Sequence, residues 1–140
     1  MGRVINPNTA GKQRTQLIRV SAIANRELLA KNRLDREARD IAAFLSFTLA
    51  AIYSSIEPTV QAWEKRDYWV KADRYRHEWQ WADELGKNMS RAILAEDWKA
   101  VQDLAGKIQI KLAGEKISAA HRQGTPWVGA WEKLQNTKNS

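Results

Sequence analysis

Basic side chains recur every seven residues near the start of the chain, at Lys12, Arg19, Arg26 and Arg33. Seven residues are nearly two turns of an α-helix, so on one helix these cations lie about 10 Å apart along a single face. Arg14 adds a further charge, and no acidic residue precedes Glu27. Such a row can neutralise successive phosphates, which predicts salt-dependent contact with nucleic acid or a ribonucleoprotein. The alternative is a solvated helix face.

The excess positive charge lies at the two ends of the chain. The formal net charge is +7 over 140 residues, and residues 1–26 hold five basic residues and no acidic one. The last 35 residues hold six basic and two acidic residues, and Lys107, Lys111 and Lys116 form a second candidate patch. Basic terminal segments often contact polyanions, although they also keep small proteins soluble.

Aromatic and basic residues alternate between Trp63 and Trp81. The basic members are Lys65, Arg66, Lys71, Arg74 and Arg76, and acids are interspersed among them. Aromatic rings can stack on unpaired bases while Lys and Arg hold the backbone. Tryptophans at helical spacing more often form a core or a protein interface. The predicted third helix has two apolar faces, and Tyr68, Tyr75 and Trp79 share one of them, which predicts a protein partner or a homodimer there. Trp69 lies on neither face, so it is expected to be exposed and is a further candidate interface residue.

Two acidic pairs occupy successive predicted helices. Glu37 and Asp40 are three residues apart, as are Glu64 and Asp67. Pairs of this kind on facing helices can hold Mg²⁺ beside a phosphate. The arrangement is similar to that of all-α nucleotide pyrophosphohydrolases, in which Glu-x-x-Glu is followed by Glu-x-x-Asp, but Asp40 stands where that pattern has Glu. Chance alone gives about one such pair, so two are unremarkable, and a Mg²⁺-dependent nucleotide hydrolase is the remote alternative.

Several kinds of chemistry are absent from the sequence. The chain has no cysteine, which excludes disulfides, cysteine-ligated metals and thiol nucleophiles. It contains no glycine-rich phosphate loop and no nucleophile elbow. We therefore expect a non-enzymatic binding protein without a cofactor or a bound metal.

The spacing of apolar residues predicts the helices that carry the candidate residues. Apolar spacing predicts a first helix from about residue 9–12 to 31, and a second from 35 to 56 with Asp35 as N-cap. Pro58 suits the first turn of a third helix, which runs to about residue 95 either unbroken or kinked near Gly86–Asn88. A fourth helix spans 97–121, and Thr125-Pro126 starts a short fifth one that ends near Leu134.

These elements predict an all-α fold, an antiparallel bundle of four main helices plus a short C-terminal Trp-rich helix. Residues 1–11 are expected to form a flexible basic arm, 12–134 the bundle domain, and 135–140 a frayed tail. The longest uncharged stretch, residues 41–56, has sixteen residues, whereas a spanning helix needs about 20. We therefore expect a buried core helix in a soluble, cytoplasmic protein that makes no membrane contact.

Overall fold

The computed structural model describes residues 7–114 and 124–139, and the regular structure in these ranges is helical. The helices are α1 (Pro7–Leu29), α2 (Arg36–Ser54), α3 (Glu57–Lys65), α4 (Trp69–Leu94), α5 (Trp98–Lys111) and α6 (Ala130–Asn139). No strand occurs among the described residues. The predicted all-α class is confirmed.

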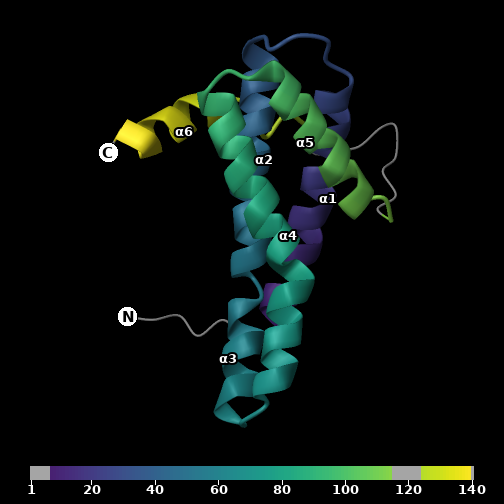
Figure 1. The fold of residues 1–140 in the computed structure, drawn as a ribbon, viewed down its shortest axis with the longest axis vertical. Coiled ribbons are helices and arrows are strands. Elements are labelled where there is room, and N and C mark those ends of the chain that lie inside the picture. Colours follow the sequence, from purple (N-terminus) through teal and green to yellow (C-terminus); the bar gives the residue numbers. More distant parts are fainter. Residues whose placement is uncertain (1–6, 115–123, 140) are drawn as a thin grey trace.

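The helices form an elongated bundle with a hairpin at one end. Figure 1 shows α2 and α4 side by side along the long axis, with α1 and α5 on one flank and α6 on the other. Helix α3 continues downward from α2, and α4 returns along both. The lower end of the molecule therefore consists of α3 and the first turns of α4.

Helix α2 lies at the centre of the bundle. Its apolar residues point in nearly every direction, which is typical of a helix with neighbours on several sides. It packs against α1, α4 and α6. Its buried residues are Ala38, Asp40, Ile41, Ala42, Ala43, Leu45, Ser46, Thr48, Leu49 and Ile52. The expectation of a buried core helix is met by this central position.

Asp35 caps α2, as the sequence predicts. Its Oδ1 accepts a hydrogen bond from the Ala38 backbone N–H at 2.8 Å. That hydrogen bond, followed by the smaller effect of Lys31, holds the pKa of Asp35 below its ordinary value. Asp97 caps α5 in the same way, through the Ala100 N–H at 3.1 Å. Side-chain caps of this kind fix where a helix begins.

The predicted third helix is interrupted at Asp67, well before Gly86. Asp67 adopts a left-handed conformation with φ 63°, and the Tyr68 N–H donates to the Trp63 carbonyl at 2.9 Å. This hydrogen bond closes the end of α3 in the manner of a Schellman motif. Aspartate tolerates the left-handed region better than most residues, so the chain reverses here without glycine.

Gly86 is a point of close helix packing and lies within an unbroken α4. The residue is buried, and a Cβ added there would lie 3.2 Å from the Leu49 Cβ and 3.3 Å from the Ser46 carbonyl oxygen of α2. A side chain would therefore hold α2 and α4 apart. The absence of a side chain, rather than flexibility, explains glycine at this position.

The two ends of the chain differ from the prediction. Helix α1 already begins at Pro7, inside the expected flexible arm, while residues 1–6 lie outside the described residues. Helix α5 ends at Lys111, and the remainder of the predicted fourth helix falls largely in 115–121, also outside the described residues. Residues 126–129 form a turn, so α6 begins later than predicted and continues through residues 135–139, where we expected fraying.

Candidate nucleic-acid interface

The basic stripe is only partly assembled. Lys12 and Arg19 are exposed on α1, and Arg26 follows on the same side but is half-buried. The spacing of seven residues places neighbours about 10 Å apart. Arg33 is exposed in the connection between α1 and α2, so it does not continue the helical row. Neither Lys12 nor Arg19 forms an ion pair with a described residue.

Arg14 points into the molecule, where we expected a phosphate contact. Its Nη1 donates to the Ser55 carbonyl oxygen and to the Ser55 Oγ, both at 3.2 Å. Its guanidinium carbon lies 5.4 Å from the ring centroid of Trp79 and 5.9 Å from that of Tyr75. Arg14 therefore ties α1 to the end of α2 and to α4, and its charge is already partnered.

Tyr75 and Trp79 are half-buried, so they do not form the open face that the helical spacing predicted. The Tyr75 ring meets Trp63 edge to face at 5.1 Å between centroids, and Trp79 lies 6.5 Å from Tyr75. These rings pack on a small second core formed by Ile56, Val60 and Ala72. They hold the α3–α4 hairpin together and attach it to the bundle.

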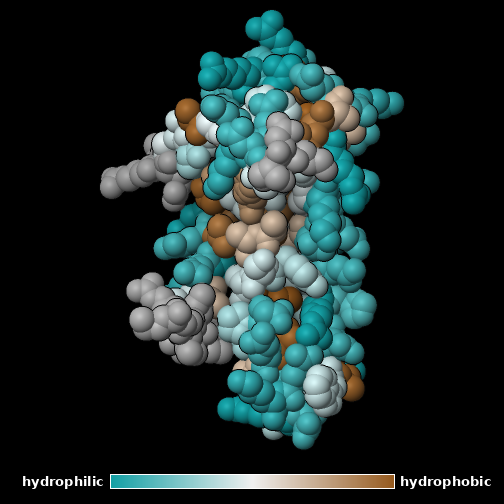
Figure 2. Space-filling model, turned by 90° about the vertical axis from the view of Figure 1, so that its left-hand side faces the viewer, coloured by the Kyte–Doolittle hydropathy of each residue, from teal (hydrophilic) through white to brown (hydrophobic). Residues whose placement is uncertain are grey.

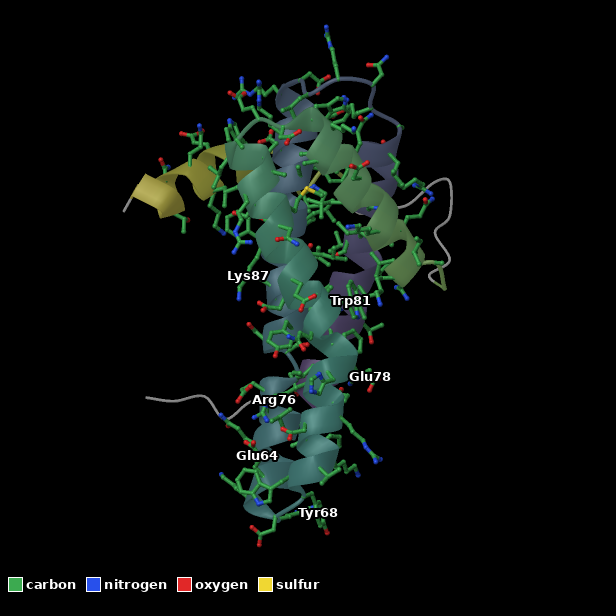
Figure 3. All side chains as sticks on the ribbon, viewed as in Figure 1. Glu64, Tyr68, Arg76, Glu78, Trp81 and Lys87 are labelled. Atoms are coloured by element: carbon green, nitrogen blue, oxygen red, sulfur yellow. The ribbon has the colours of Figure 1, made fainter. Side chains whose placement is uncertain are left out.

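Among the described residues, three consecutive exposed apolar side chains lie where α3 turns into α4, whereas Leu29, Ile110 and Val128 are exposed singly elsewhere. Tyr68, Trp69 and Val70 are 50%, 56% and 67% exposed. We call this end of the molecule, residues 65–74, the tip. Tyr68 lies at the lower extremity in Figure 3, and pale and brown residues interrupt the hydrophilic surface at the lower end of Figure 2. Clustered exposed apolar side chains on a small protein often mark a binding surface.

Cations surround the aromatic residues of the tip. Lys65, Arg66 and Arg74 are exposed, and none of them forms an ion pair with a described residue. Lys71 lies over the Trp63 ring, with its Nζ 4.6 Å from the centroid. An open hollow of about 800 Å³ is lined by Asp67, Tyr68, Trp69, Val70, Lys71 and Arg74. The hollow thus brings Arg74, a cation without an ion pair to a described residue, together with the exposed rings of Tyr68 and Trp69. Lys65 and Arg66 precede this lining in the chain.

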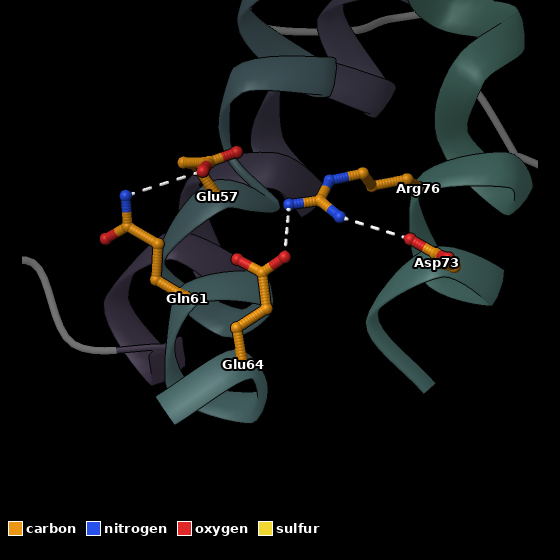
Figure 4. Close-up of polar contacts among 5 residues, drawn as sticks. All are labelled: Glu57, Gln61, Glu64, Asp73 and Arg76. Carbon is orange, nitrogen blue, oxygen red and sulfur yellow. Dashed lines mark hydrogen bonds and ion pairs between the residues drawn. The ribbon is translucent and has the colours of Figure 1, made fainter. Parts of the chain in front are cut away.

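An ion pair fixes the two helices behind the tip. The Arg76 Nη2 on α4 lies 2.8 Å from the Glu64 Oε2 on α3, and Nη1 lies 3.4 Å from Asp73 (Figure 4). The hydrogen bond to Glu64 raises the pKa of Arg76, so this guanidinium stays charged. Arg76 is thus a structural cation, unlike Arg66 and Arg74.

The two acidic pairs are not brought together. Glu37 lies 2.6 Å from the Lys31 Nζ, and the Asp40 Oδ1 accepts the Trp131 backbone N–H at 3.0 Å. Glu64 is paired with Arg76, whereas Asp67 lies in the turn at the tip. From Asp40 to the end of α2 the helix alone rises about 20 Å, and α3 lies beyond it. No group of three or more His, Cys, Asp or Glu side chains in the described ranges is placed to hold a metal ion.

The second basic patch is incomplete among the described residues. Lys107 is exposed, but the Lys111 Nζ lies 6.0 Å from the centroid of the Trp81 ring, on the α4 side of α5. Lys116 lies outside the described residues. Of the three lysines of this patch, Lys107 is therefore the described one that has no ring contact.

Helical periodicity correctly predicts that Trp69 is exposed, but it misses the turn at the tip because it assumes one continuous third helix. A signal was present in the sequence, since Tyr68, Trp69 and Val70 are consecutive. At 100° per residue they spread over about 200° and cannot all face one neighbour. The run Lys65-Arg66-Asp67 just before them supplies polar residues that suit a turn.

No protein-family model, curated protein or solved structure matches this chain. One stretch of the described residues, Arg36–Lys65, is long and apolar enough to cross a membrane by length and composition alone. Half of its most apolar window is buried inside the bundle, and core helices of soluble proteins meet the same criterion.

Proposed function

We propose that this chain is a non-enzymatic nucleic-acid-binding protein that contacts its ligand through the cations of the tip. The observation that carries the proposal is that exposed Lys65, Arg66 and Arg74, without ion pairs to described residues, surround exposed aromatic rings. Lys12 and Arg19 on α1 provide additional phosphate contacts.

The charge of the whole chain supports a polyanionic ligand. Its net charge is +7, and phosphates would release counterions on meeting the unpaired cations. Cations already engaged, such as Arg14 and Arg76, contribute little to such binding, because their charges are held by partners within the fold. We therefore propose as ligand contacts only those basic residues whose charges are not held by partners within the described part of the fold.

Fluorescence anisotropy of labelled RNA and DNA tests this function. The double variant Arg66→Glu, Arg74→Glu should weaken binding about tenfold or more at about 50 mM salt and flatten the salt dependence. The matched control is Arg36→Glu, Lys99→Glu, which reverses two exposed charges in the first turns of α2 and α5, at the opposite end of the molecule (Figure 1). Glutamate is well tolerated in a first helical turn.

Equal loss of affinity in both double variants would contradict a contact surface at the tip. Absence of binding to any nucleic acid at low salt would contradict the proposed function itself. Circular dichroism of each variant verifies that the helices remain folded.

A protein-binding role is the second candidate, and the exposed aliphatic residue Val70 favours it. Tyrosine, tryptophan and arginine are enriched at the centres of protein interfaces, and the tip presents all three. In the homodimeric version, Trp69→Ala should lower the sedimenting mass while the helical content stays constant. A wild-type monomer in sedimentation velocity would contradict that version.

A further inference from the structure

We propose that the tip binds unpaired bases of single-stranded nucleic acid, with Trp69 and Tyr68 stacking on the bases and Arg66 and Arg74 holding the backbone. This inference rests on the proposed function and specifies its ligand. It is carried by the aromatic rings of the tip, whereas the proposed function is carried by the cations.

Among the six aromatic residues from Trp63 to Trp81, Tyr68 and Trp69 are the two without a ring or cation contact to a described residue. Trp63, Tyr75, Trp79 and Trp81 each lie against another ring or a cation. Neither Tyr68 nor Trp69 makes such a contact with a described residue, and both are at least half exposed. Two adjacent exposed rings can therefore each present a π-face to a base.

Unpaired bases fit the tip better than a duplex does. In a duplex, the base faces are covered by their stacked neighbours, so exposed rings have no partner there. The hollow beside the rings measures about 800 Å³, which lies within the range of small-molecule pockets and can admit nucleotide units. Arg74 lines the same hollow, where it would neutralise a phosphate of the bound strand.

Asp67 distinguishes this ligand from a lipid bilayer. Its exposed carboxylate lies in the turn between Arg66 and Tyr68, and Asp73 lies nearby on α4. Inserting the rings into a bilayer would bring a carboxylate towards the hydrocarbon, which is costly. Towards a base the same carboxylate is useful, because it can accept a hydrogen bond from an exocyclic amino group such as cytosine N4.

The test compares labelled single-stranded RNA, single-stranded DNA and a duplex, each of about 12 nucleotides per strand, with the full-length chain. Trp69→Ala should weaken binding to both single strands about tenfold and leave the duplex unaffected, whereas Trp69→Phe should retain most of the affinity. Ile110→Ala on α5 is the matched control, because it truncates an exposed apolar side chain outside the tip. Val70→Ala tests instead whether apolar contact at the tip, without stacking, contributes to binding. Asp67→Asn, compared between oligocytidine and oligouridine, tests the amino-group contact.

The outcomes distinguish base stacking by the aromatic rings from nucleic-acid binding by the cations. Loss of single-strand binding in Trp69→Ala, with affinity retained in Trp69→Phe and in Ile110→Ala, supports stacking. If Trp69→Ala has no effect while the Arg66→Glu, Arg74→Glu double variant still weakens binding, the inference is overturned and the proposed function stands. If Val70→Ala weakens binding as much as Trp69→Ala, and the chain co-sediments with phosphatidylserine vesicles, the tip is a lipid contact and the inference is overturned. No binding to any oligonucleotide overturns both.

Discussion

Lys12 and Arg14 are two residues apart on α1, yet they have different roles. Lys12 is exposed, whereas Arg14 reaches Ser55 and the rings of Tyr75 and Trp79. The difference arises because two residues turn a helix by about 200°, so one side chain faces solvent and the other faces α2 and α4. A basic residue in the sequence is therefore not by itself a ligand contact.

At this scale we predict that Arg14→Ala lowers the free energy of unfolding by about 1 to 3 kcal/mol, through loss of two hydrogen bonds and the cation–π contacts. Lys12→Ala, its matched control, should change it by less than about 0.5 kcal/mol. Urea unfolding followed by circular dichroism measures both. Similar values for the two variants would refute the structural role of Arg14.

At the scale of helices, the turn that ends α3 and the close packing of α4 on α2 determine the arrangement of the bundle. The break at Asp67 turns one predicted helix into a hairpin and thereby creates the tip. Gly86 then allows α4 to lie close against α2, where an added Cβ would lie 3.2 Å from the Leu49 Cβ and 3.3 Å from the Ser46 carbonyl oxygen. A glycine that lowers helix propensity is thus retained for its packing.

Two glycine substitutions test this explanation. Gly86→Ala should destabilise the fold by about 1 to 3 kcal/mol, because the new Cβ meets the Leu49 Cβ and the Ser46 backbone, neither of which can move easily. Gly106→Ala in α5 meets no atom within 4 Å and should stabilise the fold by up to about 1 kcal/mol. Thermal unfolding of the two variants should shift in opposite directions. A stabilised Gly86→Ala would show that α2 and α4 are less tightly packed than described.

In the whole molecule, the C-terminal helix completes the bundle by docking on the start of α2. Trp127 is buried and meets Phe44 edge to face, and the Lys133 Nζ lies 5.0 Å from the centroid of the Phe47 ring. The polar link is Asp40, which is 8% exposed and accepts the Trp131 N–H near the first turn of α6. One carboxylate thus joins positions 91 residues apart in the chain.

We predict that Asp40→Ala costs about 1 to 3 kcal/mol, because it leaves the Trp131 N–H without its buried acceptor. It should also speed proteolysis in the turn before α6, whereas Asp40→Asn, which keeps an acceptor, should lose less. Glu132→Ala removes an exposed carboxylate from the same helical turn and should cost only a few tenths of a kcal/mol. Near-ultraviolet circular dichroism and limited proteolysis measure the docking of α6. Equal effects of Asp40→Ala and Glu132→Ala would count against the Asp40 contact.

The sequence by itself determined the features that depend on near neighbours along the chain. Apolar periodicity predicted the helical class and the burial of α2, and local capping chemistry correctly placed the start of α2 at Asp35. The sequence also predicted a short C-terminal Trp-rich helix, although α6 begins later than predicted. These features follow from spacing and from short-range hydrogen bonds, which one sequence displays directly.

Only the tertiary structure decided which surfaces meet. It separated the acidic pairs of α2 and α3, turned Arg14 inward, covered Tyr75 and Trp79, and placed Tyr68 beside Trp69 at the tip. The exposure of Trp69 itself was predicted from its position outside the apolar faces. The physical reason is that a helical pattern specifies a face but not its neighbour. Contacts between residues far apart in the chain depend on the packing of all the helices together. The left-handed residue Asp67, for example, lies in the turn that reverses the chain between α3 and α4.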